Sequence, residues 1–308
     1  MDSREEKNKE IQKELEIEEL HEKTKKYVLL FIKITFILIL LFFLLYFYTY
    51  YSSTKGIVVK EERLIDQNLP DAFHGVKIIQ FSDLYYGTTI FQDELESLVK
   101  QINIRKPDIV VFTGNIIPHN YKLSLKRQEK IIEELAKIDT TIGKYAIMGK
   151  EDDPELFQKI MNQSNFKILD NNYDVVYNQD KSPILMVGLS SYVNNKRNAT
   201  EAFKYFETET HNKDIYKIVL MSETEDLDSI LSSYQPHLVL AGNSLNGQVR
   251  LPFIGGIIKQ KGSSKYTEPY YEVNDTKIYI SSGIGSPDIG FRFLNNPSIN
   301  FLRLVANS

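Results

Sequence analysis

The sequence predicts an α/β domain that follows one membrane-spanning helix. Two observations carry this prediction: a continuous apolar run near the amino terminus and, from Ser52 onward, short apolar runs that alternate with amphipathic segments. Such alternation is typical of strands and helices that take turns along a chain. With 308 residues, of which 42% are hydrophobic and 25% charged, the chain is long and apolar enough to bury a substantial core.

Charge and cysteine content exclude several classes of function. The formal net charge is -4, so no strongly basic face and no nucleic-acid partner are expected. Because the chain contains no cysteine, a disulfide framework, a thiolate metal site and a cysteine nucleophile are all excluded.

The amino-terminal part divides into two segments. Residues 1–26 are almost entirely charged and polar, and their few apolar residues are too sparse for a continuous stripe, so a solvated helix or a disordered tail is expected. Residues 27–51 are apolar apart from Lys33 and a few hydroxyl groups. A helix of that length crosses a hydrocarbon core of about 30 Å at about 1.5 Å per residue.

The end of the apolar run favours an uncleaved anchor over a cleaved signal peptide. A signal peptide has a shorter apolar core and a small-residue cleavage site, whereas this run ends in the aromatic residues Tyr46–Tyr51. A modest excess of basic residues before the run favours a single-pass protein of the cell membrane with a cytoplasmic amino terminus and an extracytoplasmic domain, residues 52–308.

Strands and helices are expected in alternation through the domain. The predicted strands are Val76–Phe81, Asp108–Thr113, Tyr145–Met148, Ile184–Gly188, Ile218–Met221, Leu238–Ala241, Ile278–Ser282 and Asn300–Leu304. Asp93–Asn103 and Leu125–Ile138 carry their apolar residues on one side and are predicted as helices. Asp153 and Pro154 predict a further helix start, because aspartate caps free N–H groups and proline has none to lose there.

The loop after Leu238–Ala241 resembles a motif of a known family. Residues Gly242–Pro252 read GNSLNGQVRLP, and the calcineurin-like metallophosphoesterases of the membrane-anchored bacterial branch read GHTHGGQVRLP at this place. Asn243 and Leu245 stand where that family has two metal-binding histidines. The resemblance runs from about Val58 to about Leu304 and implies a two-sheet β-sandwich flanked by helices.

Two further family motifs follow the first two predicted strands. The motif SDLH appears as SDLY, so Asp83 keeps a metal-binding aspartate while Tyr85 replaces a histidine and is expected to pack into the emptied site. The motif TGD appears as TGN, which places Asn115 where the resemblance implies a carboxylate that bridges two metal ions.

The remaining two motifs are altered as well. The motif GNHD appears as GKED, so that Lys150 replaces a metal-binding asparagine and Glu151 replaces the histidine that protonates the leaving group. The LSH sequence after a strand appears as Leu220-Met221-Ser222-Glu223, which puts Glu223 in place of a metal-binding histidine. Asp83 is thus the one retained position among the eight that the resemblance marks.

These replacements predict that the binuclear metal site is lost, with no metal cofactor and no catalytic residue. A two-metal phosphoesterase needs imidazole and carboxylate ligands to hold cations about 3.5–4 Å apart. We expect Lys150 to project into the emptied volume and to form ion pairs with Asp83, Glu151 and Glu223; a lysine that points to solvent is the alternative. The acidic run Glu151–Asp153 is interpreted as a solvated loop with a helix cap rather than an oxygen-only Mg²⁺ or Ca²⁺ site.

The predicted function is binding by a membrane-anchored pseudoenzyme, with an envelope protein or a phosphorylated lipid or polymer as the partner. The alternative is an active phosphatase or phosphodiesterase with an atypical site built from Asp83, Glu151 and Glu223. Arg250 and Arg292 lie beyond the metal loops and are candidate anion-binding residues, with salt bridges at a domain edge as the plainer interpretation.

Overall fold

The chain forms two compact units, Met1–Ser52 and Ser53–Ser308, in the computed structural model. The structure describes residues 2–48, 56–119, 121–179, 182–194, 196–208, 214–287 and 290–307. The first unit is one continuous helix, α1 (Asp2–Phe47), so the polar residues before the apolar run are helical. Within α1, Lys7–Leu44 contains a stretch long and apolar enough to cross a membrane. Residues 49–51 of the predicted span lie outside the described residues.

The second unit contains two six-stranded sheets. The first sheet has the order β1-β14-β2-β3-β4-β5. Its strands are β1 (Val58–Asp66), β14 (Ser298–Ala306), β2 (Lys77–Phe81), β3 (Ile109–Thr113), β4 (Gly143–Ile147) and β5 (Lys167–Ile168). Strands β2 to β5 run parallel, β14 is antiparallel to β2, and β1 is parallel to β14.

The second sheet has the order β12-β13-β9-β8-β7-β6. Its strands are β12 (Tyr270–Val273), β13 (Thr276–Ile280), β9 (Leu238–Ala241), β8 (Tyr216–Met221), β7 (Ile184–Leu189) and β6 (Asn172–Val176). The four central strands are parallel, and both edge strands are antiparallel to their neighbours. A separate hairpin consists of β10 (Arg250–Leu251) and β11 (Gly255–Gly256).

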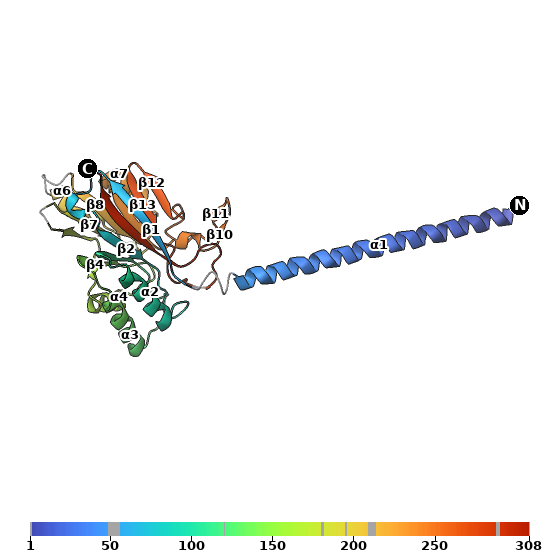
Figure 1. The fold of residues 1–308 in the computed structure, drawn as a ribbon, viewed down its shortest axis with the longest axis horizontal. Coiled ribbons are helices and arrows are strands. Elements are labelled where there is room, and N and C mark those ends of the chain that lie inside the picture. Colours follow the sequence, from blue (N-terminus) through green and yellow to red (C-terminus); the bar gives the residue numbers. More distant parts are fainter. Residues whose placement is uncertain are drawn as a thin grey trace. The chain divides into compact units, whose positions relative to one another are not determined.

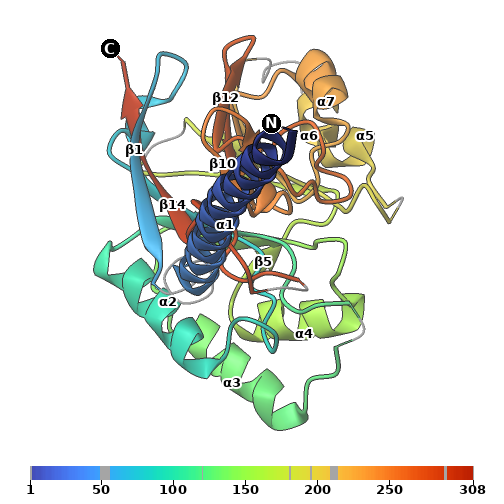
Figure 2. The ribbon, with the colours of Figure 1, turned by 90° about the vertical axis from the view of Figure 1, so that its right-hand side faces the viewer.

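Helices cover the outer face of each sheet, as Figures 1 and 2 show. The first sheet carries α2 (Gln92–Ile104), α3 (Leu125–Ala136) and α4 (Pro154–Gln163), and the second carries α5 (Ala199–Ala202), α6 (Lys204–Thr208) and α7 (Leu227–Tyr234). Two short 3₁₀ turns, η2 (Asp71–Phe73) and η3 (Leu245–Gly247), complete the unit. The predicted two-sheet sandwich with flanking helices is confirmed.

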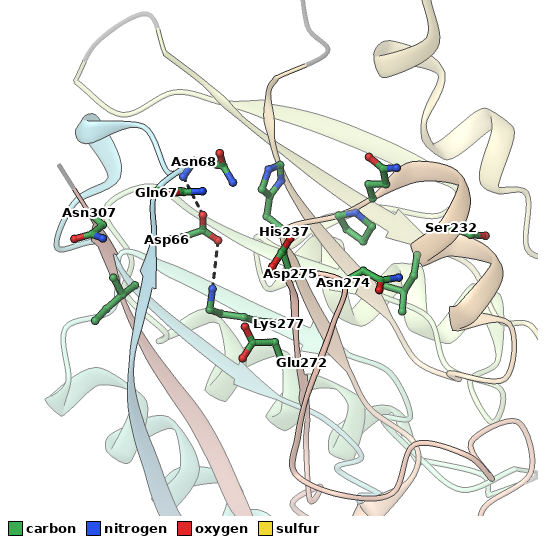
Figure 3. Close-up of a pocket in the computed structure, with 14 residues that line it drawn as sticks. Asp66, Gln67, Asn68, Ser232, His237, Glu272, Asn274, Asp275, Lys277 and Asn307 are labelled. Atoms are coloured by element: carbon green, nitrogen blue, oxygen red, sulfur yellow. Dashed lines mark hydrogen bonds and ion pairs between the residues drawn. The ribbon is translucent and has the colours of Figure 1, made fainter.

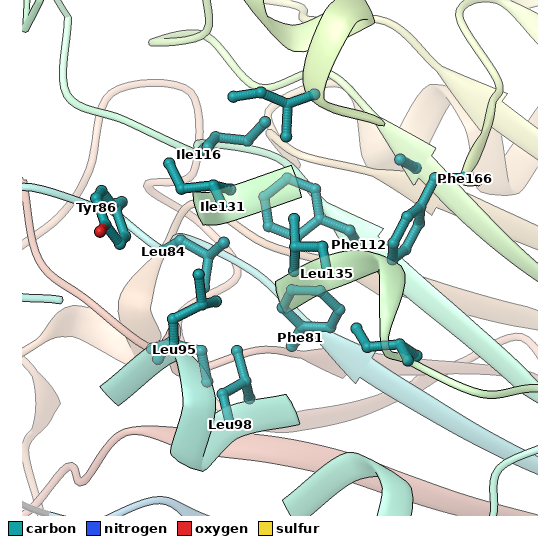
Figure 4. Close-up of a cluster of buried hydrophobic side chains, with 14 of the residues drawn as sticks. Phe81, Leu84, Tyr86, Leu95, Leu98, Phe112, Ile116, Ile131, Leu135 and Phe166 are labelled. Atoms are coloured by element: carbon teal, nitrogen blue, oxygen red, sulfur yellow. The ribbon is translucent and has the colours of Figure 1, made fainter. Parts of the chain in front are cut away.

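Three apolar clusters hold the layers together. One lies between the two sheets, one between the first sheet and α2–α4, and one between the second sheet and α5–α7. Figure 4 shows the cluster against α2–α4, where Phe81 and Phe112 of the sheet have ring centroids 5.0 Å apart. Neighbouring residues of β2 pack in different clusters, since Ile78 faces the other sheet and Ile79 faces the helices. Burial on both faces explains why these strands read as continuous apolar runs.

A buried glutamine joins the two sheets at the carboxyl ends of their strands. Gln80 of β2 is fully buried, and its Nε2 donates to the carbonyl of Ala241 in β9 at 2.9 Å. The same amide donates to Thr113 of β3 and accepts from Asn300 of β14. Because an unpaired buried amide is costly, this residue helps to set how the carboxyl ends of both sheets meet.

Candidate functional site

The five motif loops follow the carboxyl ends of β2, β3, β4, β8 and β9, and backbone contacts bring them together. The N–H of Asp83 donates to the carbonyl of Gly114 at 2.8 Å. Gly114 has a φ of 93°, and a Cβ there would lie 2.7 Å from Cα of Gly149 and 3.0 Å from Oγ of Ser222. Only glycine permits this close approach of three loops.

Asp83 lies at the centre of these loops, and both of its carboxylate oxygens accept hydrogen bonds from the protein. Its side chain is fully buried. Oδ1 accepts from Nδ2 of Asn115 at 2.7 Å, and Oδ2 accepts from the backbone N–H of Asn243 at 3.0 Å and from the hydroxyl of Ser82. Burial raises the pKa of Asp83 to about 6, although these hydrogen bonds and the charge of Lys150 oppose the shift.

Asn115 and Asp152 connect the loops after β3 and β4. The Oδ1 atom of Asn115 accepts from the N–H of Glu151 at 3.1 Å, so both ends of its amide are engaged. The carboxylate of Asp152 accepts from the N–H groups of Asn115, Ile116 and Gly149 at 2.8, 2.6 and 2.9 Å. Asp152 is buried, and burial raises its pKa to about 7. It is therefore a clasp between two loops, which corrects the expectation of a solvated acidic loop at this position.

The helix cap that the sequence predicted is present beside this clasp. The carboxylate of Asp153 accepts from the N–H of Leu156 at 2.9 Å, and Pro154 occupies the first turn of α4. Among the acidic residues of this loop, Asp153 therefore acts as the cap and Asp152 connects the two loops.

The expected lysine-centred network is divided into two separate groups. Lys150 forms an ion pair with Glu151, and their side chains are 10% and 20% exposed. Glu223 is fully buried and its carboxylate lies 3.7 Å from the guanidinium of Arg197, which also pairs with Asp226. Among the described residues Arg197, and not the predicted Lys150, forms the ion pair with Glu223. Arg197 lies in a loop outside every motif, so the sequence offered no signal for it.

Leu245, Tyr85 and Asn243 fill the remaining space of the loop centre and are fully buried. A Cβ on Gly283 would lie 2.4 Å from Cδ2 of Leu245 and 2.9 Å from Cβ of Asp83, so Leu245 packs beside the retained aspartate. Asn243 donates through Nδ2 to Oγ of Ser263 at 2.9 Å. The loop centre is therefore a packed interior rather than an open cavity, and Oδ1 of Asn243 and Oγ of Ser222 are buried there without a hydrogen-bond partner among the described residues.

Five of the eight marked positions have a left-handed backbone. The φ angles are 54° at Asp83, 45° at Tyr85, 63° at Asn115, 60° at Asn243 and 50° at Leu245. Asparagine and aspartate tolerate this conformation, whereas for tyrosine and leucine it costs conformational energy, of the order of 1–3 kcal/mol. The surrounding contacts must hold the loops in these conformations, since the side chains at Tyr85 and Leu245 do not favour them.

The residues present do not fit a binuclear metal centre. In the part of the chain that the structure describes, no group of three or more His, Cys, Asp or Glu side chains is arranged to hold a metal ion. The oxygens of Asp83 already accept protein hydrogen bonds, both ends of the Asn115 amide are engaged, and Leu245 offers no donor atom. Two cations need several free oxygen or nitrogen ligands at one place.

The two predicted anion-binding arginines already engage protein acceptors. Arg292 is 1% exposed, and its guanidinium donates to the carbonyls of Ser282 at 2.7 Å and Gly285 at 2.6 Å. Arg250 donates to the carbonyl of Asn246 at 3.0 Å and pairs with the carboxylate of Glu268. Arg292 is therefore an internal clamp of the β13–β14 loop, and the plainer interpretation of a salt bridge describes Arg250.

Open space lies beside the loop centre and at the opposite end of the sheets. A pocket of about 780 Å³ is lined by charged side chains of both signs, which are the basic His119, Lys122, Lys150, Lys159 and Lys196 and the acidic Glu151, Asp152, Asp153 and Glu155. A pocket of about 730 Å³ lies at the amino ends of β9 and β13 (Figure 3). There Lys277 pairs with Asp66 at 3.6 Å, and burial lowers the pKa of His237 to about 4. Only the first of these pockets adjoins the motif loops.

Two layered sheets with motif loops at their carboxyl ends define a metallophosphoesterase-like domain. The chain is 29% identical over 258 residues to the protein named uncharacterized metallophosphoesterase YkuE of Bacillus subtilis, an alignment that covers 82% of this chain and 87% of that protein. It is 26% identical over 250 residues to the uncharacterized metallophosphoesterase Cj0846 of Campylobacter jejuni, covering 76% of this chain and 60% of the relative. The names of these relatives support the calcineurin-like metallophosphoesterase family.

Other comparisons give more distant similarities or find nothing. A transmembrane protein with metallophosphoesterase domain from Danio rerio is 23% identical, with 76% of this chain and 54% of the relative covered. The 5'-nucleotidase precursor from Thermus thermophilus aligns with a TM-score of 0.45 at 10% identity over 75% of this chain and 54% of that chain. A dimetal phosphatase from Danio rerio aligns with a TM-score of 0.42 at 11% identity over 68% and 88% of the two chains. No family model matches the chain.

Proposed function

We propose that this protein is a membrane-anchored, catalytically degenerate metallophosphoesterase-like protein that binds a phosphorylated envelope ligand without hydrolysing it. One observation carries the proposal: Asp83, the single retained ligand position, is fully buried and accepts hydrogen bonds on both oxygens. A metal ion at Asp83 would share these oxygens with the donors of Asn115, Asn243 and Ser82 and would find few other ligands, since Leu245 offers none. Without cations, neither an activated water nor a stabilised leaving oxygen is available.

The choice of a phosphorylated ligand rests on the pocket of about 780 Å³ beside the loop centre. Lys122 and Lys196 are exposed at its rim, and Lys159 adds a third ammonium group. The pocket also contains acidic residues, but Glu151 pairs with Lys150, and Asp152 and Asp153 accept backbone N–H groups, which leaves Glu155 beside the three ammonium groups. Ammonium groups bind phosphate oxygens as point charges, which supports a phosphomonoester or phosphodiester as the ligand. With α1 in the cell membrane and the domain outside, such a ligand is a phosphorylated lipid or polymer of the envelope.

Metal analysis and activity assays test the loss of catalysis. We expect the full chain, purified in detergent, to contain no stoichiometric transition metal. We also expect no turnover of p-nitrophenyl phosphate or bis-p-nitrophenyl phosphate with added Mn²⁺ above that of the Asp83→Asn variant. Stoichiometric metal together with turnover that disappears in Asp83→Asn would instead establish the alternative, an active phosphoesterase with an atypical site.

Binding measurements test the ligand class. Soluble polyphosphate and phosphatidic acid in mixed micelles serve as separate probes, so that a polymer is distinguished from a lipid. We expect binding that weakens with salt and falls when Lys122 and Lys159 are both replaced by methionine. A matched variant with Lys100 and Lys106 replaced by methionine removes the same charge elsewhere on the surface and should bind normally. Equal binding by both variants contradicts the proposed pocket, and crosslinking to one envelope protein in cells would favour a protein partner.

A further inference from the structure

The hairpin β10–β11 carries an apolar tip that the fold does not explain. The turn residues are Pro252, Phe253 and Ile254, and the N–H of Ile254 donates to the carbonyl of Leu251 at 3.2 Å. Proline at the second position of a turn and a left-handed residue at the third are features of a type II turn, whose third residue is ordinarily glycine. Here that residue is Phe253, with a φ of 66°.

The tip is also the most exposed apolar surface of the second unit. Phe253 has a relative exposure of 109% and Ile254 of 73%. The apolar patch is completed by four further exposed side chains, which are Leu251, Ile257, Ile258 and Leu294. An exposed phenylalanine in a strained backbone conformation does not stabilise the folded state. An exposed apolar patch of this kind ordinarily marks an interaction site.

We propose that this patch inserts into the interface of an anionic lipid bilayer and holds the domain against the membrane surface. The proposal does not depend on whether the chain binds or hydrolyses a phosphorylated ligand.

Charges behind the tip are complementary to an anionic surface. Lys259 and Lys261 follow the patch directly and are exposed. Lys60 of β1 is half-buried and lies near Arg250 and Arg292; burial and the charges of these arginines lower the pKa of Lys60 to about 8. Proteins that bind anionic membrane surfaces combine an apolar edge with nearby lysines. The apolar side chains enter the boundary of the acyl chains, and the ammonium groups contact the lipid headgroups.

The hairpin has a firm base at the end of the unit where the chain enters. The N–H of Arg250 donates to the carbonyl of Phe293 at 2.9 Å, and the segment from Phe293 leads to Pro297. The carbonyl of Pro297 accepts from the N–H of Val58, the first residue of β1, at 2.8 Å. The patch and the start of β1 therefore belong to the same end of this unit.

The short connection to the apolar helix makes a bilayer the expected occupant. Seven residues separate Tyr48 from Gly56, and the eight steps between these two Cα atoms span at most about 28 Å. The entry point of the second unit must therefore stay within that distance of the end of an anchor that crosses the membrane. This connection keeps the bilayer close to the patch, whereas it does not hold a second copy of the chain or a protein partner there.

A single-tryptophan probe tests the proposal, because the chain contains no tryptophan. The full chain carrying Phe253→Trp is reconstituted into vesicles of phosphatidylglycerol and phosphatidylcholine, with and without bromine on the acyl chains. Tyr177→Trp is the matched control, since Tyr177 is 56% exposed and follows β6, at the amino end of its neighbour β7. Ile254→Trp provides a second probe position in case Phe253→Trp disturbs folding.

The proposal expects that brominated lipid quenches most of the Phe253→Trp emission and leaves the Tyr177→Trp emission unchanged. It also expects quenching to fall in pure phosphatidylcholine and when Lys259 and Lys261 are both replaced by glutamate. Equal emission of Phe253→Trp and Ile254→Trp in brominated and ordinary lipid overturns the proposal. Emission that changes with the density of chains in the vesicle but not with bromine also overturns it, because a second copy would then cover the tip.

Discussion

Replacing Asp83 by asparagine should remove a pH dependence that the buried carboxyl imposes on stability. The pKa of Asp83 is raised by burial from 3.8 to about 6 in the folded protein. The folded state therefore holds the proton more tightly than the unfolded state does. The stabilisation from protonated Asp83 is fully present below about pH 4 and is lost as the pH rises through about 6.

The size of this effect follows from the pKa shift. A shift of about two units corresponds to about 3 kcal/mol between the two protonation states. Asparagine at position 83 cannot titrate. Its Nδ2 group is a donor and would face one of the donors of Asn115, Asn243 and Ser82, which leaves a buried donor unpaired and costs about 1–3 kcal/mol. At pH 7 that cost and the relief from a buried charge nearly cancel. At pH 4.5 the natural protein should be more stable by about 2–3 kcal/mol.

Urea denaturation of the full chain in micelles, followed by circular dichroism between pH 4.5 and 7.5, measures both proteins. Asp152 titrates in the same range, and the charge of Asp83 helps to raise its pKa, so the difference between the two curves reports Asp83 together with its effect on Asp152. Parallel curves would refute the argument. A stability difference that grows with pH would do so more strongly, since it would show a lowered pKa, as in a carboxylate held by cations.

Two substitutions test the packing and the ion pairs of the loop centre, and a third serves as an exposed control. Leu245→Ala should lower the free energy of unfolding by about 2–4 kcal/mol, because it opens a cavity beside Gly283; a loss below about 0.5 kcal/mol in urea denaturation would show that the position is not packed. Arg197→Met should cost about 3–5 kcal/mol by leaving buried Glu223 without its cation. Lys265→Met breaks an ion pair whose side chains are both more than half exposed, so it should change the free energy of unfolding by no more than about 1 kcal/mol. Equal losses in Arg197→Met and Lys265→Met would contradict the importance of burial.

The elements that the sequence predicted are those whose cause is local. Strands buried on both faces must be apolar throughout, and β2, β3, β7, β8 and β9 appear within a few residues of the predicted ranges. The start of α4 follows from Asp153 and Pro154, because a cap involves only residues within one helical turn. Strands β1, β6 and β12 escaped prediction, since each lies at a sheet edge and carries polar residues on its exposed side.

The sequence by itself determined the alternation of strands and helices and the apolar amino-terminal helix, and its motifs resembled a family closely enough to predict a two-sheet sandwich and the replacement of seven of eight ligand positions. Only the tertiary structure decided how the remaining charges are paired. In the folded protein Glu223 pairs with Arg197 and Lys150 pairs with Glu151. Asp152 connects two loops by accepting their N–H groups, and buried Arg292 donates to backbone carbonyls. Partner choice depends on distances in space between loops that are far apart along the chain, and a charge pattern read along the sequence does not contain those distances.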